Sequence, residues 1–191
     1  PVLQKLKKQK FEFELVVSGA HLTKSQNLTY KRILLDKFNI VKKIYSLTST
    51  DKDTQRPKAI GILINNLTQI VERIKPDFIF VIGDREEAIA GAIVGNYMKK
   101  LVVHLGGGET AYGNADDPIR FAISKLSHLH CCLSKFSCKK LIESGEEKFR
   151  IFNTGNPAFI NIKNTPKITK GKLYDQIGLA NIYKKYIVLI K

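Results

Sequence analysis

Short apolar runs alternate with helix-patterned segments along most of this chain, and that alternation restricts the possible folds more than any other feature. Runs rich in Val, Ile, Leu and Phe that end in glycine or polar residues predict strands at 13–19, 76–84, 101–108, 128–134 and 150–157. Apolar residues at helical spacing predict helices at 57–75, 85–100, 116–127 and 137–145. Short connections between such elements produce βαβ units, so the predicted class is α/β with a Rossmann-like parallel sheet. The strands are apolar on both faces, as strands covered on both sides require.

The domain organisation changes after Pro157. Residues 1–160 are predicted to form one Rossmann-like lobe, and residues 161–191 begin with a polar, lysine-rich linker. A helix pattern and the strand-like run YIVLI follow, and they predict the start of a second, truncated lobe. The chain also lacks an initiator Met, and we expect its first strand to be missing.

Charge and composition limit the function classes. The 32 basic and 17 acidic residues among 191 give a net charge of +15, but the lysines are scattered and no nucleic-acid-binding motif accompanies them. We therefore predict no nucleic-acid partner, and a positive field that favours a small phosphate-bearing ligand. No apolar run approaches the roughly 20 residues of a membrane span, and no signal peptide is recognisable. The three cysteines form no C-x-x-C pair, which indicates no metal site and a reducing, cytoplasmic location.

Ligands of open α/β sheets bind where the strands end at their carboxyl side. The loops at those ends combine glycine with polar or charged residues, and they span 18–23, 83–87, 106–117 and 153–157. Three acids in them, Asp84, Glu109 and Asp116, are predicted to meet in one cleft. Carboxylates gathered without metal-binding histidines favour general acid and base catalysis. The alternative is that Asp84 caps a helix starting near Arg85, and that one acid of Asp116 and Asp117 caps the next helix.

Three consecutive glycines, 106–108, precede Glu109. Such a run predicts backbone that passes close to a ligand or cradles an anion with its amide groups. The pattern is not G-x-G-x-x-G, so a dinucleotide site is not predicted. The predicted substrate-binding residues are His21, Arg85, Gly107, Gly108, Asp117 and Arg120. The remaining histidines, His104, His128 and His130, are interpreted as packed residues of the strands.

Several long motifs in order carry a resemblance to a known family. They are VVSGAHL…LTYKRI, RIKPDFIFVIGDREEAIAGAI, VVHLGGGETAYGNADDPIRFAISKLSHLH and RIFNTGNPAFINI. Together they resemble the hydrolysing branch of the UDP-N-acetylglucosamine 2-epimerases, from about Val2 to Lys191. The chain is similar also to the related enzymes that act on UDP-N,N'-diacetylbacillosamine.

This resemblance implies a two-lobe, glycosyltransferase-B-like (GT-B-like) fold, of which the chain is the N-terminal, sugar-side lobe. It implies removal of the C2 proton and elimination of UDP, then addition of water to give N-acetylmannosamine, a precursor of sialic-acid-type sugars. No cofactor or metal is implied, the partner is a UDP-sugar, and the full-length form is expected to be a homo-oligomer. Asp84 matches the family's G-D acid, Glu109 the G-G-E acid, Asp116 the acid before the helix, and Arg120 the arginine after it.

The chain departs from the family pattern at two positions. Gly106 stands where many members carry glutamate or histidine, and Phe121 stands where a histidine often follows the arginine. These departures leave open a degenerate lobe that binds a nucleotide sugar without catalysis, and a generic glycosyltransferase lobe is a further alternative. Because the nucleotide-binding lobe is missing, we expect the 191-residue chain alone to be inactive.

Overall fold

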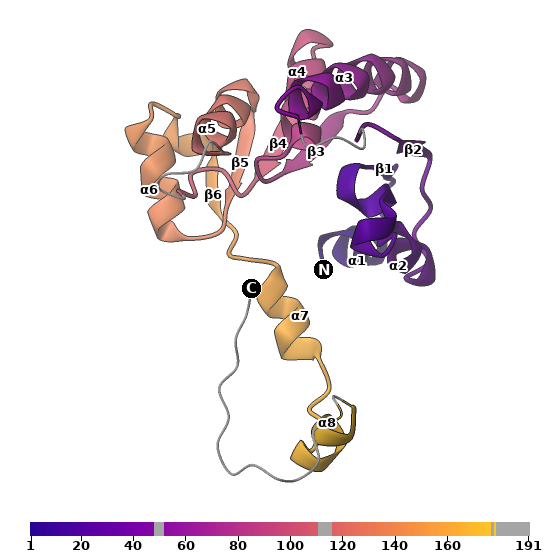
Figure 1. Ribbon diagram of the computed structural model, residues 1–191. Coiled ribbons are helices and arrows are strands. Elements are labelled where there is room, and N and C mark those ends of the chain that lie inside the picture. Colours follow the sequence, from indigo (N-terminus) through magenta and orange to yellow (C-terminus); the bar gives the residue numbers. More distant parts are fainter. Residues whose placement is uncertain (48–51, 111–115, 177, 179–191) are drawn as a thin grey trace. The chain divides into compact units, whose positions relative to one another are not determined.

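The computed structural model describes residues 1–47, 52–110, 116–176 and 178 (Figure 1). By the contacts within the chain there are two compact units, Pro1–Pro157 and Ala158–Lys191. The strands of the first unit are β1 (Val16–Ser18), β2 (Lys42–Ile44), β3 (Phe78–Ile82), β4 (Leu101–Leu105), β5 (Leu129–Cys132) and β6 (Ile151–Asn153). Its α-helices are α1 (Val2–Lys8), α2 (Tyr30–Leu35), α3 (Gln55–Ile74), α4 (Glu86–Tyr97), α5 (Asp116–Leu126) and α6 (Lys135–Glu143). The second unit holds α7 (Ala158–Asn164) and α8 (Lys170–Gln176).

All strand pairs in the described residues are parallel. β3, β4, β5 and β6 form one sheet in that order, and β1 and β2 form a second, two-stranded sheet. Each strand of the larger sheet is connected to the next by one α-helix, as in βαβ units of a parallel sheet. The α/β class with a Rossmann-like parallel sheet is therefore confirmed.

The core forms where α3 and α4 pack side by side over the strands (Figure 1). Helix α4 is rich in Ala and Gly, which lets its backbone approach the sheet closely. A Cβ atom added to Gly95 would lie 2.4 Å from a methyl group of Val102 on β4, so only glycine fits at that crossing. A second cluster joins the smaller sheet to the same helices, with Ile44 of β2 packed among residues of α3 and α4.

The two faces of the larger sheet differ. Residues that point toward α4 and α5, such as Val81 and Val102, are buried in the main apolar cluster. The alternate residues of the strands point the other way and remain 44 to 62% exposed: Phe78, Phe80, Ile82, Leu101 and Phe152. The sequence predicts cover on both faces, but in the described part of the chain helices bury only one of them.

The observed elements depart from the sequence prediction at several points. Helix α6 begins at Lys135, two residues early, because the Ser134 hydroxyl accepts a hydrogen bond from the Ser137 N–H and caps it there. The three-residue strand β2 and the six-residue helix α2 carry no clear periodic pattern and were not predicted. The predicted strand YIVLI lies outside the described residues, and the predicted linker and second lobe at 161–191 stay a prediction. No helix of the described chain is both long and apolar enough for a bilayer span.

Candidate active site at the carboxyl ends of the strands

Backbone hydrogen bonds join the carboxyl ends of neighbouring parallel strands. The Gly83 N–H donates to the Leu105 carbonyl at 2.9 Å, and the Gly106 N–H donates to the Cys131 carbonyl at 3.0 Å. The end of β1 reaches the same edge, because a Cβ on Gly19 would collide with the Glu87 carboxylate in the first turn of α4. The loops that the sequence predicts at one edge of the sheet therefore begin from neighbouring strand ends.

Asp84 and Arg120 are brought together although 36 residues separate them. The Arg120 guanidinium donates a charge-assisted hydrogen bond to the Asp84 carboxylate, and its second terminal nitrogen donates to the Gly106 carbonyl at 3.2 Å. Both side chains are mostly buried, at 17% and 14% exposure. Arg120 thus fixes the carboxylate at the end of β3 against the glycine run after β4.

The prediction that Asp84 caps the following helix is wrong. Helix α4 begins at Glu86, and Arg85 occupies the N-cap position without a side-chain cap. The Asp84 carboxylate turns to the Arg120 guanidinium instead, because the ion pair offers it a charged donor on the neighbouring helix. The next pair of acids, Asp116 and Asp117, lies in the first turn of α5, where negative charge complements the helix dipole.

Arg56 forms a second ionic centre that the sequence analysis missed. It lies in the first turn of α3 and binds the Glu86 carboxylate, while its terminal nitrogen lies 3.2 Å from Asp116 Oδ1. Glu86 is buried, and the two acids raise the pKa of Arg56. Asp116 is therefore tied to α3 and α4 at the point where α5 begins.

Glu109 points to another neighbour, the N-terminus of α6. Its carboxylate accepts a hydrogen bond from the Ser137 hydroxyl, which also contacts the capping Ser134 hydroxyl at 2.5 Å. Acids are favoured at helix N-termini, so this contact stabilises α6 as well as orienting Glu109.

The glycine run has a packing requirement of its own. A Cβ on Gly107 would lie 2.8 Å from Ser124 Oγ and 3.0 Å from His104 Nδ1, and one on Gly108 would lie 2.2 Å from the Ser137 carbonyl oxygen. These two glycines are needed where the loop passes against α5 and α6. Their predicted contact with substrate stays a prediction.

The other predicted binding residues lie on separate segments of the chain. His21 Nδ1 contacts the Thr29 hydroxyl at 2.7 Å, both in the segment after β1, and Arg85 is exposed. Asp117 lies in the first turn of α5. Residues 111–115, which connect Glu109 to α5, lie outside the described residues. Each of the three acids thus has a partner of its own, and their meeting around one sugar-sized cleft stays a prediction.

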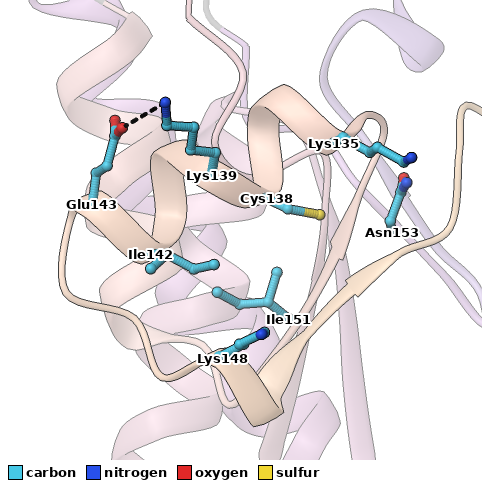
Figure 2. Close-up of a pocket in the computed structure, with 8 residues that line it drawn as sticks. All are labelled: Lys135, Cys138, Lys139, Ile142, Glu143, Lys148, Ile151 and Asn153. Atoms are coloured by element: carbon cyan, nitrogen blue, oxygen red, sulfur yellow. Dashed lines mark ion pairs between the residues drawn. The ribbon is translucent and has the colours of Figure 1, made fainter.

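A hollow of about 540 Å³ lies elsewhere, between α6 and the edge strand β6 (Figure 2). Its lining residues are Lys135, Cys138, Lys139, Ile142, Glu143, Lys148, Ile151 and Asn153. Figure 2 shows the Ile142 and Ile151 side chains facing each other between α6 and β6, and Lys139 paired with Glu143. None of the residues that the sequence predicts for the site lines this hollow.

A buried ionic cluster around Glu146 also escaped the sequence analysis. The Glu146 carboxylate lies 2.7 Å from Lys125 Nζ, 3.0 Å from Arg150 and 3.3 Å from His130 Nε2. His130 is fully buried, and burial lowers its pKa despite the opposing effect of Glu146. The interpretation of His130 as a packed residue is confirmed.

Comparison with known proteins places these features in a family. The model of the family described as UDP-N-acetylglucosamine 2-epimerase matches residues 4–190. The GDP/UDP-N,N'-diacetylbacillosamine 2-epimerase (hydrolyzing) of Campylobacter jejuni is 38% identical over 92% of the chain and 45% of its own length. The UDP-N-acetylglucosamine 2-epimerase of Neisseria meningitidis is 34% identical over 76% of the chain and 38% of its own length.

Comparison with solved structures identifies proteins of the same name. The structure of the Methanocaldococcus jannaschii UDP-GlcNAc 2-epimerase in complex with UDP-GlcNAc and UDP superimposes with a TM-score of 0.77 at 18% identity, over 93% of this chain and 49% of that one. The chain therefore spans about half the length, or less, of the relatives it matches. It has the α/β fold of one lobe of these GT-B-like proteins, and its sequence belongs to the UDP-N-acetylglucosamine 2-epimerase family.

Proposed function

We propose that this chain is the sugar-side lobe of a hydrolysing nucleotide-sugar 2-epimerase that converts UDP-N-acetylglucosamine to N-acetylmannosamine and UDP. The observation that carries the proposal is the pairing of Asp84 with Arg120 at the end of β3, in a chain of this family. A carboxylate held in one orientation by a guanidinium is suited to proton transfer at a fixed point. Asp84, Glu109 and Asp116 are proposed as the catalytic acids.

The proposed reaction balances in two steps. A carboxylate accepts the C2 proton, the C1–O bond to UDP breaks, and the electron pair of the C–H bond forms the C1–C2 double bond of a glycal. Water then adds its oxygen to C1, and C2 receives a proton on the opposite face. Two carboxyl groups, one accepting and one donating a proton, meet this requirement without a metal.

The relatives support the choice of substrate class. Those at 34 to 38% identity are named as epimerases of UDP- or GDP-linked N-acetyl sugars. The proposed substrate-binding residues are His21, Arg85, Gly107, Gly108, Asp117 and Arg120. The proposal includes a homo-oligomer of the full-length form and a cytoplasmic location.

The test is to incubate the protein expressed from its complete gene with UDP-N-acetylglucosamine in D₂O. We expect stoichiometric UDP and N-acetylmannosamine carrying one deuterium at C2, read by ³¹P and ¹H NMR. Asp84→Asn should lower the rate by about 10²–10⁴-fold, the usual contribution of a general base. Glu72→Gln, an exposed carboxylate of α3, is the matched control and should leave the rate unchanged.

Two results would overturn the proposal. One is a product without deuterium at C2, because the mechanism requires exchange of that proton with solvent. The other is an Asp84→Asn variant with the rate of the Glu72→Gln control. For the 191-residue chain by itself we expect no UDP release, and detectable release would contradict the expectation that a second lobe is needed.

A second substrate has specific support. The relative at 38% identity is named for N,N'-diacetylbacillosamine linked to GDP or UDP, which makes that sugar the second candidate. The two candidates differ at C4 and C6 of the sugar, so parallel rate measurements on both UDP-sugars separate them. A higher kcat/KM for UDP-N,N'-diacetylbacillosamine would assign the second.

Gly106 provides the test for a non-catalytic lobe. Its φ is +90°, and a Cβ there would find no atom closer than 3.8 Å, so a side chain has space but its backbone is strained. If Gly106→Glu or Gly106→His creates turnover where the unchanged protein has none, the chain is a degenerate binding lobe. Activity in the unchanged protein excludes that alternative.

A further inference from the structure

His104 of β4 is a fully buried side chain that joins three elements of the site. Its Nε2 lies 2.9 Å from the Gly83 carbonyl oxygen at the end of β3, and its Nδ1 lies 3.1 Å from Ser124 Oγ on α5. A carbonyl oxygen can only accept, so Nε2 carries the proton and Nδ1 of the neutral ring is the acceptor. Both nitrogens are thus used, one toward each neighbouring element.

The ring is held neutral and has no freedom to turn. Burial lowers the pKa of His104 to about 4, so the neutral form persists across the physiological range. The Gly107 backbone closes the space beside Nδ1 and Ser124 Oγ, where a Cβ would be 3.0 and 2.8 Å away. Rotation of the ring about Cβ–Cγ would break both hydrogen bonds of this buried side chain.

Each of the two hydrogen-bond partners of His104 lies next to one member of the Asp84–Arg120 pair. Gly83 directly precedes Asp84, so its carbonyl orientation sets the direction in which the chain leaves β3. Ser124 lies one helical turn after Arg120. Its single hydroxyl proton is shared between two acceptors, His104 Nδ1 and the Arg120 carbonyl oxygen, each 3.1 Å from Oγ. One imidazole therefore constrains both the carboxylate and the guanidinium that orients it.

We propose that His104 is a positioning residue that fixes the Asp84–Arg120 pair through its hydrogen bonds to Gly83 and Ser124, without contacting substrate. The catalytic meaning of this role rests on the proposed function, whereas the geometric role does not. A shift of the reacting groups by about 1 Å can cost on the order of 10²-fold in rate, so such a residue would act mainly on kcat.

Two conservative variants each remove one of the two hydrogen bonds of His104. The side-chain nitrogen of glutamine coincides with His Nε2, so His104→Gln keeps the donor to Gly83. The side-chain oxygen of asparagine coincides with Nδ1, so His104→Asn keeps only the acceptor for Ser124. The matched control is His128→Asn, which preserves the acceptor that His128 Nδ1 offers to the Val102 N–H at 3.1 Å.

The experiment uses the protein expressed from its complete gene, labelled with [¹⁵N]arginine. In the unchanged protein we expect resolved guanidinium Nη signals from Arg120, because its two hydrogen bonds hinder rotation. In His104→Gln, which has lost the acceptor for Ser124, exchange between these signals should be faster. In His104→Asn these signals should average, and kcat should fall about 10–100-fold with KM within threefold. Averaging in His104→Asn and none in His128→Asn supports the proposal.

Two outcomes would overturn it. If the Arg120 signals stay resolved in His104→Asn, His104 does not fix the pair, whatever the activity is. If the signals average but the kcat of an active enzyme is unchanged, the catalytic part of the proposal is wrong, because the rate does not depend on the geometry that His104 sets. An unchanged protein that turns over no nucleotide sugar refutes the proposed function alone, because the NMR result still decides the positioning role.

Discussion

Gly107→Ala is the substitution for which the structure gives the sharpest expectation. The added methyl carbon would lie 2.8 Å from Ser124 Oγ and 3.0 Å from His104 Nδ1, whereas carbon atoms normally pack at about 3.5–4.0 Å. Both neighbours are buried, with 1% and 0% exposure, so neither can move into solvent. Gly107 does not have a left-handed φ, and the substitution therefore measures packing without backbone strain.

Overpacking of a buried site typically costs about 1–3 kcal/mol. For a chain of 150–250 residues each kcal/mol changes Tm by about 2–4 °C, so we expect Tm to fall by about 2–12 °C. Gly61→Ala provides the control, because Gly61 lies inside α3 and no atom would lie within 4 Å of its new Cβ. That variant should gain about 0.5–1 kcal/mol from helix propensity.

Thermal and urea unfolding followed by circular dichroism measure both variants. The same substitution in a Ser124→Ala background removes the closest contact, so its cost should shrink by at least about 0.5 kcal/mol there. The reasoning fails if Gly107→Ala is as stable as Gly61→Ala. It also fails if its cost is the same with and without the Ser124 hydroxyl.

Three further outcomes are expected. Burial lowers the pKa of His104 to about 4, while the unfolded value is about 6.5, so the free energy of unfolding should be highest above pH 7 and fall as pH drops. At pH 5 this group should cost about 2 kcal/mol of stability. Urea unfolding of His104→Gln should not show this pH-dependent loss. Arg56→Ala removes the partner of the buried Glu86 and should cost about 1–3 kcal/mol in the same assay, whereas Arg73→Ala on the exposed end of α3 should cost less than about 0.5. Gly106→Ala should cost about 1–2 kcal/mol through its φ of +90°, and an equal cost at Gly61 would contradict that reason.

The large sheet and its helices could be predicted because their signals are local. Strands β3 and β4 are continuous apolar runs that end in glycine, and α3 shows apolar residues at helical spacing before Pro76. Strand β2 could not be predicted, because its three residues KKI contain two lysines and no turn signal bounds them. Its place depends on Ile44 packing against α3 and α4, a contact that no local pattern records.

The sequence predicts which residues belong to the candidate site better than it predicts which of them are in contact. Asp84 and Arg120 were both named, but their pairing across 36 residues could not be read from spacing. Arg56 gave no signal, because it meets Glu86 30 residues away and Asp116 60 residues away. The sequence predicts that the glycine run lets the backbone pass close to a ligand, whereas close contact with α5 and α6 already requires Gly107 and Gly108.

The exposed face of the larger sheet has a consequence for how copies of this chain behave together in solution. Aromatic and aliphatic side chains such as Phe78, Phe80 and Ile82 are about half exposed on a protein with a net charge of +15. At low ionic strength the mutual repulsion of these cations keeps the apolar faces of separate molecules apart. At 1 M salt the Debye length shrinks to about 3 Å and that repulsion is screened. Association between molecules should therefore increase with added salt, opposite to the behaviour of an assembly held by ion pairs.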